Sequence, residues 1–449
     1  MKRFPAAIVA VGLAAFACNR PQPQTREPAS APSRAVDDDA ELGRLADERV
    51  MSELSVLADA PLAAYVNGVL SAVARQANPT ATRWTLRLLD SSHVSVRSGP
   101  GGYVYVTRGF LACLGSEAEL AAALAHEVAH VSERHWRRQA EYLVKRGVED
   151  GDLDKLPPDD RLALLARLRD EERTADRLAL GYLERAGYAR GGLAKVLRLF
   201  AELERLAGGS RVPPLLRTHP VTGERLRALE QQKDPGGEWK AREYLSKIDG
   251  LPFGEDPRDG YLYGDRYVVP NADFELVLPS LWRAQLIGKD LMAALPGKAT
   301  ILLVARSEHG SLERTLDALG KRESFTESNL GGQRVFVAKS VPEGALSSLS
   351  WVFDTPVAPL VLALVVPRGD EETDAVKALL GGVGKISNPA LKNLGVLRIR
   401  LTTLERETSL RALFAENPPR TNLATLALIN GVGPDQPLPA GSVVKRVDP

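Results

Sequence analysis

The chain has 449 residues, which is too long for one ordinary core and predicts two or three domains. Lys and Arg together number 58 and Asp and Glu 57, so no net positive charge attracts polyanions and nucleic-acid binding is not expected. Hydrophobic residues make up 44% and charged residues 26%, which is typical of soluble globular proteins rather than of disordered or membrane-spanning ones.

The N-terminus has the features of a secretory signal. Lys2 and Arg3 precede an apolar stretch, residues 4–16, which is too short to cross a bilayer of about 30 Å as a helix. Small residues then precede Cys18, as in a bacterial lipobox. We therefore predict that residues 1–18 are a lipoprotein signal peptide and that Cys18 is acylated; the alternative is ordinary cleavage with an incidental cysteine.

A lipid on Cys18 predicts a periplasmic or surface-exposed protein that is attached to the membrane through this lipid only. Residues 19–40 are rich in Pro, Ala and Ser and are expected to form a disordered tether. The residue after the cysteine is Asn19 rather than an Asp that would retain the protein at the inner membrane, so the outer membrane is favoured. Cys113, left without a disulfide partner, is interpreted as a buried apolar residue.

Apolar residues recur at helical spacing through much of the first half of the chain. Helices are expected over residues 38–76, 116–145, 160–186 and 192–206, with three short strands between residues 84 and 107. Ser116 and Glu119 form a capping box at the start of the second helix, and Gly187 ends the third. The pattern predicts a mainly helical domain with a small antiparallel sheet over residues 41–250.

The character of the chain changes after residue 250. Strand-like runs occur at residues 267–269, 274–278, 300–305, 334–338 and 360–366, with helical segments at 312–319 and 371–380. We predict an α+β accessory domain over residues 251–390, distantly similar to PsbP-type domains, and a small module of its own over residues 391–449. The predicted fold class of the whole chain is therefore α+β.

The helix expected over residues 116–145 contains the run His126-Glu127-Val128-Ala129-His130. Two histidines four residues apart lie on one helix face, close enough to share one zinc ion. Glu127 lies where it can take a proton from zinc-bound water and later give it to the leaving amine. The alternative is a polar helix face with incidental histidines, which is weakened because the chain has only 6 His.

A zinc hydrolase needs a third protein ligand, and the next long helix offers one. Glu172 and Asp176 fall within its apolar stripe, which also contains Leu165, Leu168, Ala179 and Leu183. Carboxylates seldom lie in such a stripe without a partner, so Glu172 is predicted to bind the metal and Asp176 to accept a hydrogen bond from a metal-bound imidazole. Two alternatives stay open: Glu171 as the ligand, although it points about 100° away, or salt bridges to arginines on neighbouring helices.

Four motifs in order resemble peptidase family M48, which includes HtpX, the CAAX prenyl endopeptidases and the BepA-like proteins. They are residues 101–109, residues 117–130, Glu172-x-x-Ala175-Asp176 and Thr218-His219-Pro220, and the likeness covers roughly residues 41–250. The resemblance, closest to the soluble periplasmic branch, implies a gluzincin fold. It also implies that His126, His130 and Glu172 bind one zinc ion per chain and that Glu127 is the general base.

Three further features are interpreted around this site. His219 is expected to reach the metal region, where it holds the oxyanion or occupies the fourth zinc position in a resting form; the alternative is a turn histidine fixed by Pro220. The strand that contains Gly102, Tyr103, Val104 and Tyr105 is expected to be an edge strand that pairs with an extended substrate, and the alternative is ordinary sheet structure. His135 is interpreted as a residue of the helix surface.

The leading hypothesis is a zinc-dependent endopeptidase that acts on unfolded or misassembled envelope proteins, in their quality control. A second is an envelope chaperone or assembly factor whose zinc site is structural or silenced, with residues 251–449 recruiting a protein partner. A third is that these C-terminal residues bind cell-wall glycan. The presence of Glu127 favours the enzyme, because a structural zinc site does not need a general base.

Overall fold

The computed structural model describes residues 39–77, 83–148, 155–206, 223–231, 236–287, 290–320, 322–340, 345–393, 395–416 and 421–448. The predicted signal peptide, Cys18, nearly all of the predicted tether and His219 lie outside these residues. Among the described residues, no helix combines the length and the apolar character needed to cross a membrane.

The chain folds into two compact units. The helical unit contains the described residues from 39 to 254 together with residues 397–448, and the β-rich unit contains residues 255–396. The predicted α+β fold class is confirmed, because helices dominate one unit and strands the other. The predicted division differs at the C-terminus, where residues 397–448 belong to the helical unit rather than to a module of their own.

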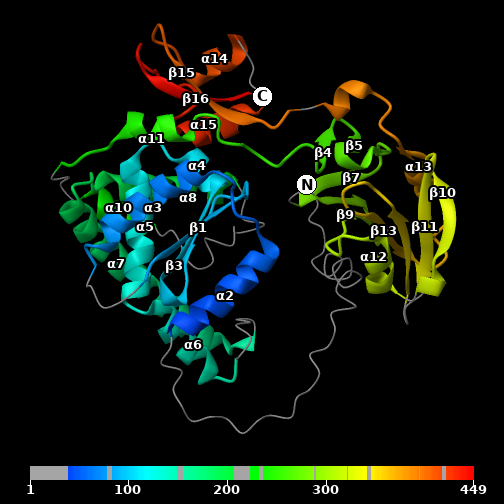
Figure 1. Ribbon diagram of the computed structural model, residues 1–449, viewed down its shortest axis with the longest axis horizontal. Helices are drawn as coiled ribbons and strands as arrows, with labels where there is room; N and C mark the ends of the chain where they lie inside the picture. The colour runs from blue at the N-terminus through cyan, green and yellow to red at the C-terminus, as the bar shows by residue number, and fades with distance from the viewer. Residues whose placement is uncertain are drawn as a thin grey trace. The chain divides into compact units, whose positions relative to one another are not determined.

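The helical unit is built around one central helix. Its elements up to residue 248 are α2 (Asp39–Glu53), α3 (Ala60–Ala74), β1 (Thr85–Leu89), β2 (Val96–Ser98), η1 (Pro100–Gly102), β3 (Tyr103–Thr107), α4 (Arg108–Cys113), α5 (Glu117–Ser132), α6 (His135–Val144), α7 (Pro158–Ala186), α8 (Gly191–Leu206), α10 (Gly223–Glu230) and α11 (Ala241–Ile248). The central helix α5 packs against α3, α7 and α8, while α2 lies against η1, beside the sheet (Figure 1).

The sequence of α5 explains its central position. Ser116 Oγ accepts a hydrogen bond from the Glu119 N–H at 3.3 Å, as the capping box predicts. The Glu119 carboxylate accepts a hydrogen bond at 2.7 Å from the N–H of Gly115, the residue before the cap. From Glu117 to Ala129 every residue is buried, and five of the first nine are alanine. Small side chains allow neighbouring helices to approach closely on all sides, so the motif helix becomes the core of the unit.

The motif helix ends earlier than predicted. Arg134 has a φ of 52°, in the left-handed region, so the chain reverses there and α6 starts at His135. The sequence predicts one uninterrupted helix from the capping box at Ser116 to about residue 145. The break changes the direction of every side chain after Arg134.

The three-stranded sheet has the order β1-β3-β2. Strand β1 runs parallel to β3 and β2 runs antiparallel to it, so the sheet is mixed rather than purely antiparallel. Helix α2 is fixed to the sheet through the buried Asp47, whose carboxylate accepts hydrogen bonds from Arg87 and Tyr105. This arrangement places β3 in the middle and leaves β2 at the edge.

The β-rich unit consists of two antiparallel sheets. The larger has the strand order β10-β11-β12-β13-β9-β8-β7, and the smaller has the order β14-β6-β5-β4. The bounds are β4 (Tyr261–Tyr263), β5 (Arg266–Val269), η3 (Pro270–Ala272), β6 (Phe274–Val277), β7 (Arg283–Ile287), β8 (Asp290–Leu295), β9 (Thr300–Arg306), α12 (Leu312–Leu319), η4 (Arg322–Ser324), β10 (Thr326–Leu330), β11 (Gln333–Ser340), β12 (Leu346–Phe353), β13 (Leu360–Pro367), α13 (Asp374–Gly381), β14 (Val383–Gly384) and η5 (Pro389–Lys392).

The central strand β13 is buried on both faces. Leu360, Leu362 and Leu364 join the core shared with the smaller sheet, whereas Val361 packs against Leu316 of α12 on the other face. A strand that is covered on both faces has apolar residues at successive positions rather than at alternate ones. This explains the continuous apolar run, residues 360–366, from which the strand was predicted. The similarity to PsbP-type domains stays a prediction.

The C-terminal residues complete the core of the helical unit. They form β15 (Arg398–Thr403), α14 (Leu410–Glu416), α15 (Leu423–Asn430) and β16 (Val443–Asp448), with β15 and β16 antiparallel. Ile399, Leu426 and Val447 join the same apolar cluster as the residues of α4 and α5. The buried Lys445 donates hydrogen bonds from Nζ to the carbonyls of Ala112 at 2.9 Å and Leu114 at 2.8 Å. The predicted independence of this segment is therefore wrong, because its apolar face has no core of its own.

Candidate metal centre

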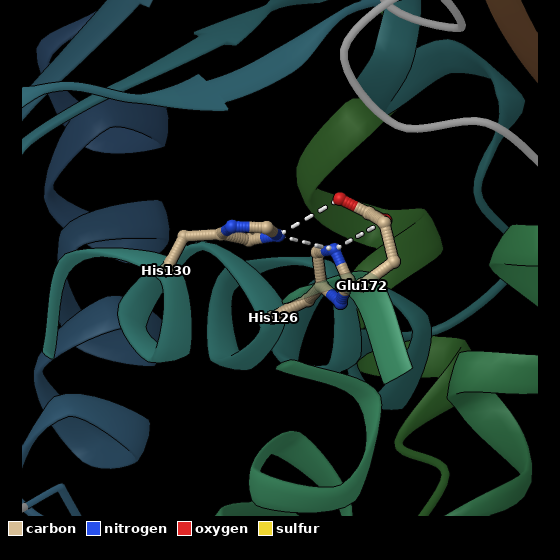
Figure 2. A group of neighbouring side chains, drawn as sticks. All are labelled: His126, His130 and Glu172. Carbon is tan, nitrogen blue, oxygen red and sulfur yellow. Dashed lines mark hydrogen bonds and ion pairs between the residues drawn. The ribbon is translucent and has the colours of Figure 1, made fainter. Parts of the chain in front are cut away.

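Two helices bring three potential metal ligands together. His126 and His130 project from one face of α5, and Glu172 projects toward them from α7 (Figure 2). The Nε2 atoms of the two histidines are 3.0 Å apart. The Glu172 carboxylate places Oε2 at 3.3 Å from His126 Nε2 and Oε1 at 3.2 Å from His130 Nε2.

These distances fit a zinc ion. Zinc binds imidazole nitrogen at about 2.0–2.1 Å and carboxylate oxygen at about 2.0–2.2 Å, and tetrahedral geometry then separates its ligand atoms by about 3.3 Å. Two imidazoles and one carboxylate are also the donor set of catalytic zinc sites, which leave a fourth position open. The residues present therefore suit one zinc ion, which the three side chains that the sequence predicted would hold.

The electrostatics of the site also favour a cation. Burial lowers the pKa of His126, but the neighbouring carboxylates of Glu172 and Asp176 outweigh it and raise this pKa to about 10. A field that attracts a proton so strongly attracts a metal cation as well.

Glu171 does not join the group. Its Oε1 atom lies 3.5 Å from Nε of Arg138, and burial raises the pKa of the Glu171 carboxyl. Neighbouring positions on a helix point about 100° apart, so Glu172 faces the histidines while Glu171 faces α6. The alternative ligand considered from the sequence is therefore not the one that the structure places at the centre.

Asp176 lies directly behind one of the histidines. Its Oδ1 atom is 3.1 Å from Nδ1 of His126. A proton on Nδ1 that is donated to this carboxylate leaves Nε2 as the lone-pair atom that faces the metal position. The structure thus places Asp176 in the orienting position that was predicted for it.

Arg225, on α10, is a site residue that the sequence analysis did not identify. It donates from Nε to Asp176 Oδ2 at 2.7 Å and from Nη2 to Asp176 Oδ1 at 2.8 Å, and its Nη1 lies 2.7 Å from Glu172 Oε2. Burial raises the pKa of Asp176, but the hydrogen bonds from Arg225 and His126 hold it below its ordinary value. Salt bridges to an arginine were the alternative role for Glu172 and Asp176. The structure shows such salt bridges, to Arg225, in addition to the metal group.

The sequence indicated that a positive charge lies near the two carboxylates, but it did not indicate that Arg225 supplies it. Two buried carboxylates on one helix require positive charge in addition to the metal. The chain contains 58 Lys and Arg, and only the packing of α10 decides which one supplies that charge.

Glu127 is held by the edge strand. Its side chain is buried, and its Oε2 atom accepts a hydrogen bond from Ser98 Oγ at 2.7 Å. The same hydroxyl lies 3.3 Å from the backbone oxygen of Glu127. Ser98 is the last residue of β2, so this contact joins the sheet to the helix that carries the motif.

The strand predicted to pair with substrate is not an edge strand. Tyr103, Val104 and Tyr105 pair with β1 on one side, and Val104 and Tyr105 also pair with β2 on the other. Gly102 lies in η1, before the strand. That prediction is wrong because the parallel pairing of β1 occupies the side of β3 that was expected to be open.

The strand next to Glu127 is β2. Ser95 and Gly99 direct their backbone groups to Thr107 and Tyr103 of β3, and Arg97 lies opposite Tyr105 in the same register. In an antiparallel pair, alternate residues face the partner strand, so the backbone N–H and C=O groups of Val96 and Ser98 point away from β3. Among the described strands, none pairs with this outer side of β2.

His135 is buried and lies behind the second histidine, contrary to the prediction of a surface residue. Its Nδ1 atom is 2.8 Å from Nδ1 of His130. Burial, together with the neighbouring His130, lowers the pKa of His135 to about 3. His135 is therefore neutral, and its Nδ1 atom is able to accept a hydrogen bond. Each histidine ligand therefore has a partner behind it, Asp176 for one and His135 for the other.

Comparison with known proteins finds a family that this region resembles. Residues 61–147 and 160–233 match the model of peptidase family M48. These segments contain His126, Glu127, His130, Glu172 and Arg225, so the match includes every residue of the metal centre described above.

Several curated relatives have related names. The Putative beta-barrel assembly-enhancing protease of Vibrio cholerae is 27% identical over 192 residues, which are 38% of this chain and 39% of the relative. The Beta-barrel assembly-enhancing protease of Yersinia pestis is 24% identical over 47% of this chain and 48% of its own length. The protein of that name from Escherichia coli K12 is 21% identical over 43% of each chain.

These similarities cover only part of each relative. The chain spans less than half the length of the relatives, 39% to 48%. A solved structure from Bacteroides thetaiotaomicron is 16% identical over 28% of this chain and 50% of its own, with a TM-score of 0.22, which is too low to inform the fold. The motifs, the ligand geometry and the family match agree over the same residues, and in this region the chain is similar to peptidase family M48.

Proposed function

We propose that this protein is a zinc-dependent endopeptidase that hydrolyses peptide bonds of unfolded or misassembled envelope proteins. The observation that carries the proposal is the metal group itself, in which ligand atoms of His126, His130 and Glu172 lie 3.0 to 3.3 Å apart beside a buried glutamate. A structural zinc site would not need Glu127 next to its ligands.

The chain's own residues have distinct parts in the proposed hydrolysis. A bound zinc ion would polarise the scissile carbonyl and make water a better nucleophile near neutral pH. Glu127, oriented by Ser98, takes a proton from the attacking water and transfers it to the leaving nitrogen as the C–N bond breaks. Asp176 and His135 keep the two imidazoles in the tautomer that presents Nε2, and Arg225 fixes both carboxylates.

The outer side of β2 is proposed to bind the substrate backbone. Val96 and Ser98 direct N–H and C=O groups away from β3, and Ser98 also touches Glu127. An extended peptide that pairs there would run past the general base. This replaces the role that was predicted for β3.

The location and substrate class are supported by two separate observations. The lipobox-like sequence at Cys18 supports a lipid-anchored protein of the periplasm, with the outer membrane favoured. The names of the relatives, which refer to enhancement of β-barrel assembly, support assembling envelope proteins as substrates. The β-rich unit is proposed to recruit a protein or cell-wall partner.

The substitution Glu127→Gln tests the enzymatic assignment. Zinc content is expected to stay at one ion per chain, because the three ligands are unchanged, while cleavage of a denatured protein is lost because the general base is removed. Elemental analysis measures the zinc content, and gel electrophoresis measures cleavage of the denatured protein. Unchanged cleavage would exclude Glu127 as the base, and a wild-type protein that binds zinc yet cleaves nothing would favour the chaperone or assembly factor.

A further inference from the structure

Arg97 is the central residue of β2, the strand whose outer side is proposed to bind the substrate backbone. Its side chain is exposed, and its guanidinium carbon lies 5.4 Å from the centre of the Tyr105 ring. Val96 is buried in the core that contains α5, and Ser98 contacts Glu127 of that helix. Because side chains alternate between the two faces of a strand, Arg97 lies on the face of the sheet opposite α5.

The surroundings of Arg97 leave its charge available to a ligand. The contact with Tyr105 is a cation–π interaction, which does not occupy the N–H groups of the guanidinium. Asp47, the acid that the Tyr105 hydroxyl contacts, is buried, and its carboxylate is held by Arg87. Among the residues that the structure describes, none forms an ion pair with Arg97, so its charge faces solvent.

The hydrogen-bonding pattern of β2 decides where a paired peptide meets Arg97. The N–H and C=O groups of Arg97 face β3, so those of Val96 and Ser98 face outward. For a peptide antiparallel to β2, the residue opposite Arg97 is therefore in the non-hydrogen-bonded position, in which Cα atoms are about 4.5 Å apart and side chains are closest. Cross-strand partners lie on the same face of a sheet, so this residue directs its side chain toward the guanidinium.

The same register keeps that peptide residue close to the chemistry. The residue opposite Ser98 lies beside the general base, because Ser98 Oγ is 2.7 Å from Glu127 Oε2. The residue opposite Arg97 is its immediate neighbour in the peptide, but its side chain points to the other face of the sheet, away from α5. A charged side chain at this position therefore contacts Arg97 without entering the buried metal centre.

We infer that Arg97 selects an acidic side chain at one position of the bound peptide, the position that lies opposite it when the peptide pairs with β2. The inference rests on the proposed peptidase function and on pairing with β2. It names the substrate class, which is extended segments that carry Asp or Glu close to the cleaved bond. The exposed guanidinium attracts a carboxylate there and repels Lys or Arg.

The exposure of Arg97 sets the size of the preference. A charged cross-strand pair in contact with water contributes little, so kcat/KM is expected to be about 3- to 10-fold higher for Glu than for Lys at low ionic strength. At about 1 M salt the screening length falls to about 3 Å, and the ratio is expected to approach one.

The first experiment uses the zinc-loaded full-length protein and one peptide whose cleavage site has been mapped by mass spectrometry. Each position close to the cleaved bond is replaced in turn by Glu, Gln or Lys, and kcat/KM is measured at low and at high salt. One position is expected to favour Glu over Gln and Gln over Lys. The positions directly before and after it should lack this order, because their side chains face α5.

Substitutions of Arg97 connect this order to one side chain. Arg97→Gln removes the charge and should bring the Glu to Lys ratio at that position close to one, and Arg97→Glu should invert it. Arg242→Glu is the matched control, because Arg242 is an exposed arginine of α11 and the change in net charge is the same. Its ratio is expected to equal that of the wild type. Because each ratio is measured within one variant, a change in stability does not imitate the expected result.

The outcomes separate the inference from the proposed function. Equal Glu to Lys ratios for the wild type and Arg97→Glu at every position would overturn the inference, and so would the same change of ratio in Arg242→Glu. Either result leaves the peptidase assignment standing, because the peptides are still cleaved. Failure of the zinc-loaded wild type to cleave any peptide or denatured protein would overturn both.

Discussion

His130 and His135 have their Nδ1 atoms 2.8 Å apart, although on one continuous helix their side chains would point about 140° away from each other. The left-handed residue Arg134 makes the contact possible, because it ends α5 and returns the chain toward the histidine ligand. His130 Nε2 faces His126 and Glu172, so the proton of His130 lies on Nδ1 and is donated to the neutral His135. A ligand at the end of α5 is thereby oriented by the first residue of α6.

The substitution His135→Phe is expected to weaken zinc binding about 10- to 100-fold, because the Nδ1 proton of His130 loses its acceptor and the ring is no longer oriented. Competition with a chromogenic chelator measures this affinity. The variant His135→Asn keeps a hydrogen-bond acceptor, so it should retain part of the zinc affinity that His135→Phe loses. The control is His93→Phe, since His93 is exposed, and equal zinc affinity for His135→Phe and this control would contradict the orienting role.

The substitution Arg225→Met is expected to lower the free energy of unfolding of the metal-free helical unit by about 3–5 kcal/mol, because Asp176 and Glu172 keep their buried charges without the guanidinium. Zinc should reduce this difference, since the metal supplies positive charge to Glu172. Denaturant unfolding with and without zinc provides the measurement. Arg227→Met on the same helix removes an exposed arginine and should change stability by less than about 0.5 kcal/mol.

The substitution Ser98→Ala is expected to lower kcat by about 10-fold while zinc content stays the same, because Glu127 loses the hydroxyl that orients it. Steady-state kinetics on one peptide separate kcat from KM. Ser246→Ala, which removes an exposed hydroxyl on α11, is the control. An equal kcat in the two variants would show that the backbone alone positions Glu127.

The substitution Lys445→Met tests how the C-terminal strand is attached, with a defined dependence on pH. Burial lowers the pKa of Lys445 from 10.5 to about 8, so between these values the unfolded chain binds more protons than the folded one. Stability of the wild type relative to the variant therefore rises with pH across this window. Near pH 10 the variant should be less stable by about 1–3 kcal/mol, because the carbonyls of Ala112 and Leu114 lose their donor, and by less at pH 7.

The control for this measurement is Lys377→Met, which removes an exposed lysine of α13 and should show no such pH dependence. A constant difference between wild type and Lys445→Met from pH 7 to 10 would mean that Lys445 titrates in the folded protein as it does in the unfolded chain.

The sequence by itself determined the parts of the site that depend on helical periodicity. A spacing of four residues places His126 and His130 on one face whatever surrounds the helix, and the capping box defines where that helix begins. The apolar stripe of the next long helix indicated Glu172 and Asp176, because a buried carboxylate requires a partner. These inferences need only local geometry and the cost of burying charge.

Only the tertiary structure decided which groups surround those residues. Arg225 and Ser98 approach from elements distant in sequence, and no local pattern distinguishes them from other arginines and serines. The central position of β3 depends on its parallel pairing with β1, and the burial of His135 depends on one backbone reversal at Arg134. Such contacts are selected by the packing of whole elements, whose energies are summed over many residues far apart in the chain, and for that reason the sequence pattern alone did not reveal them.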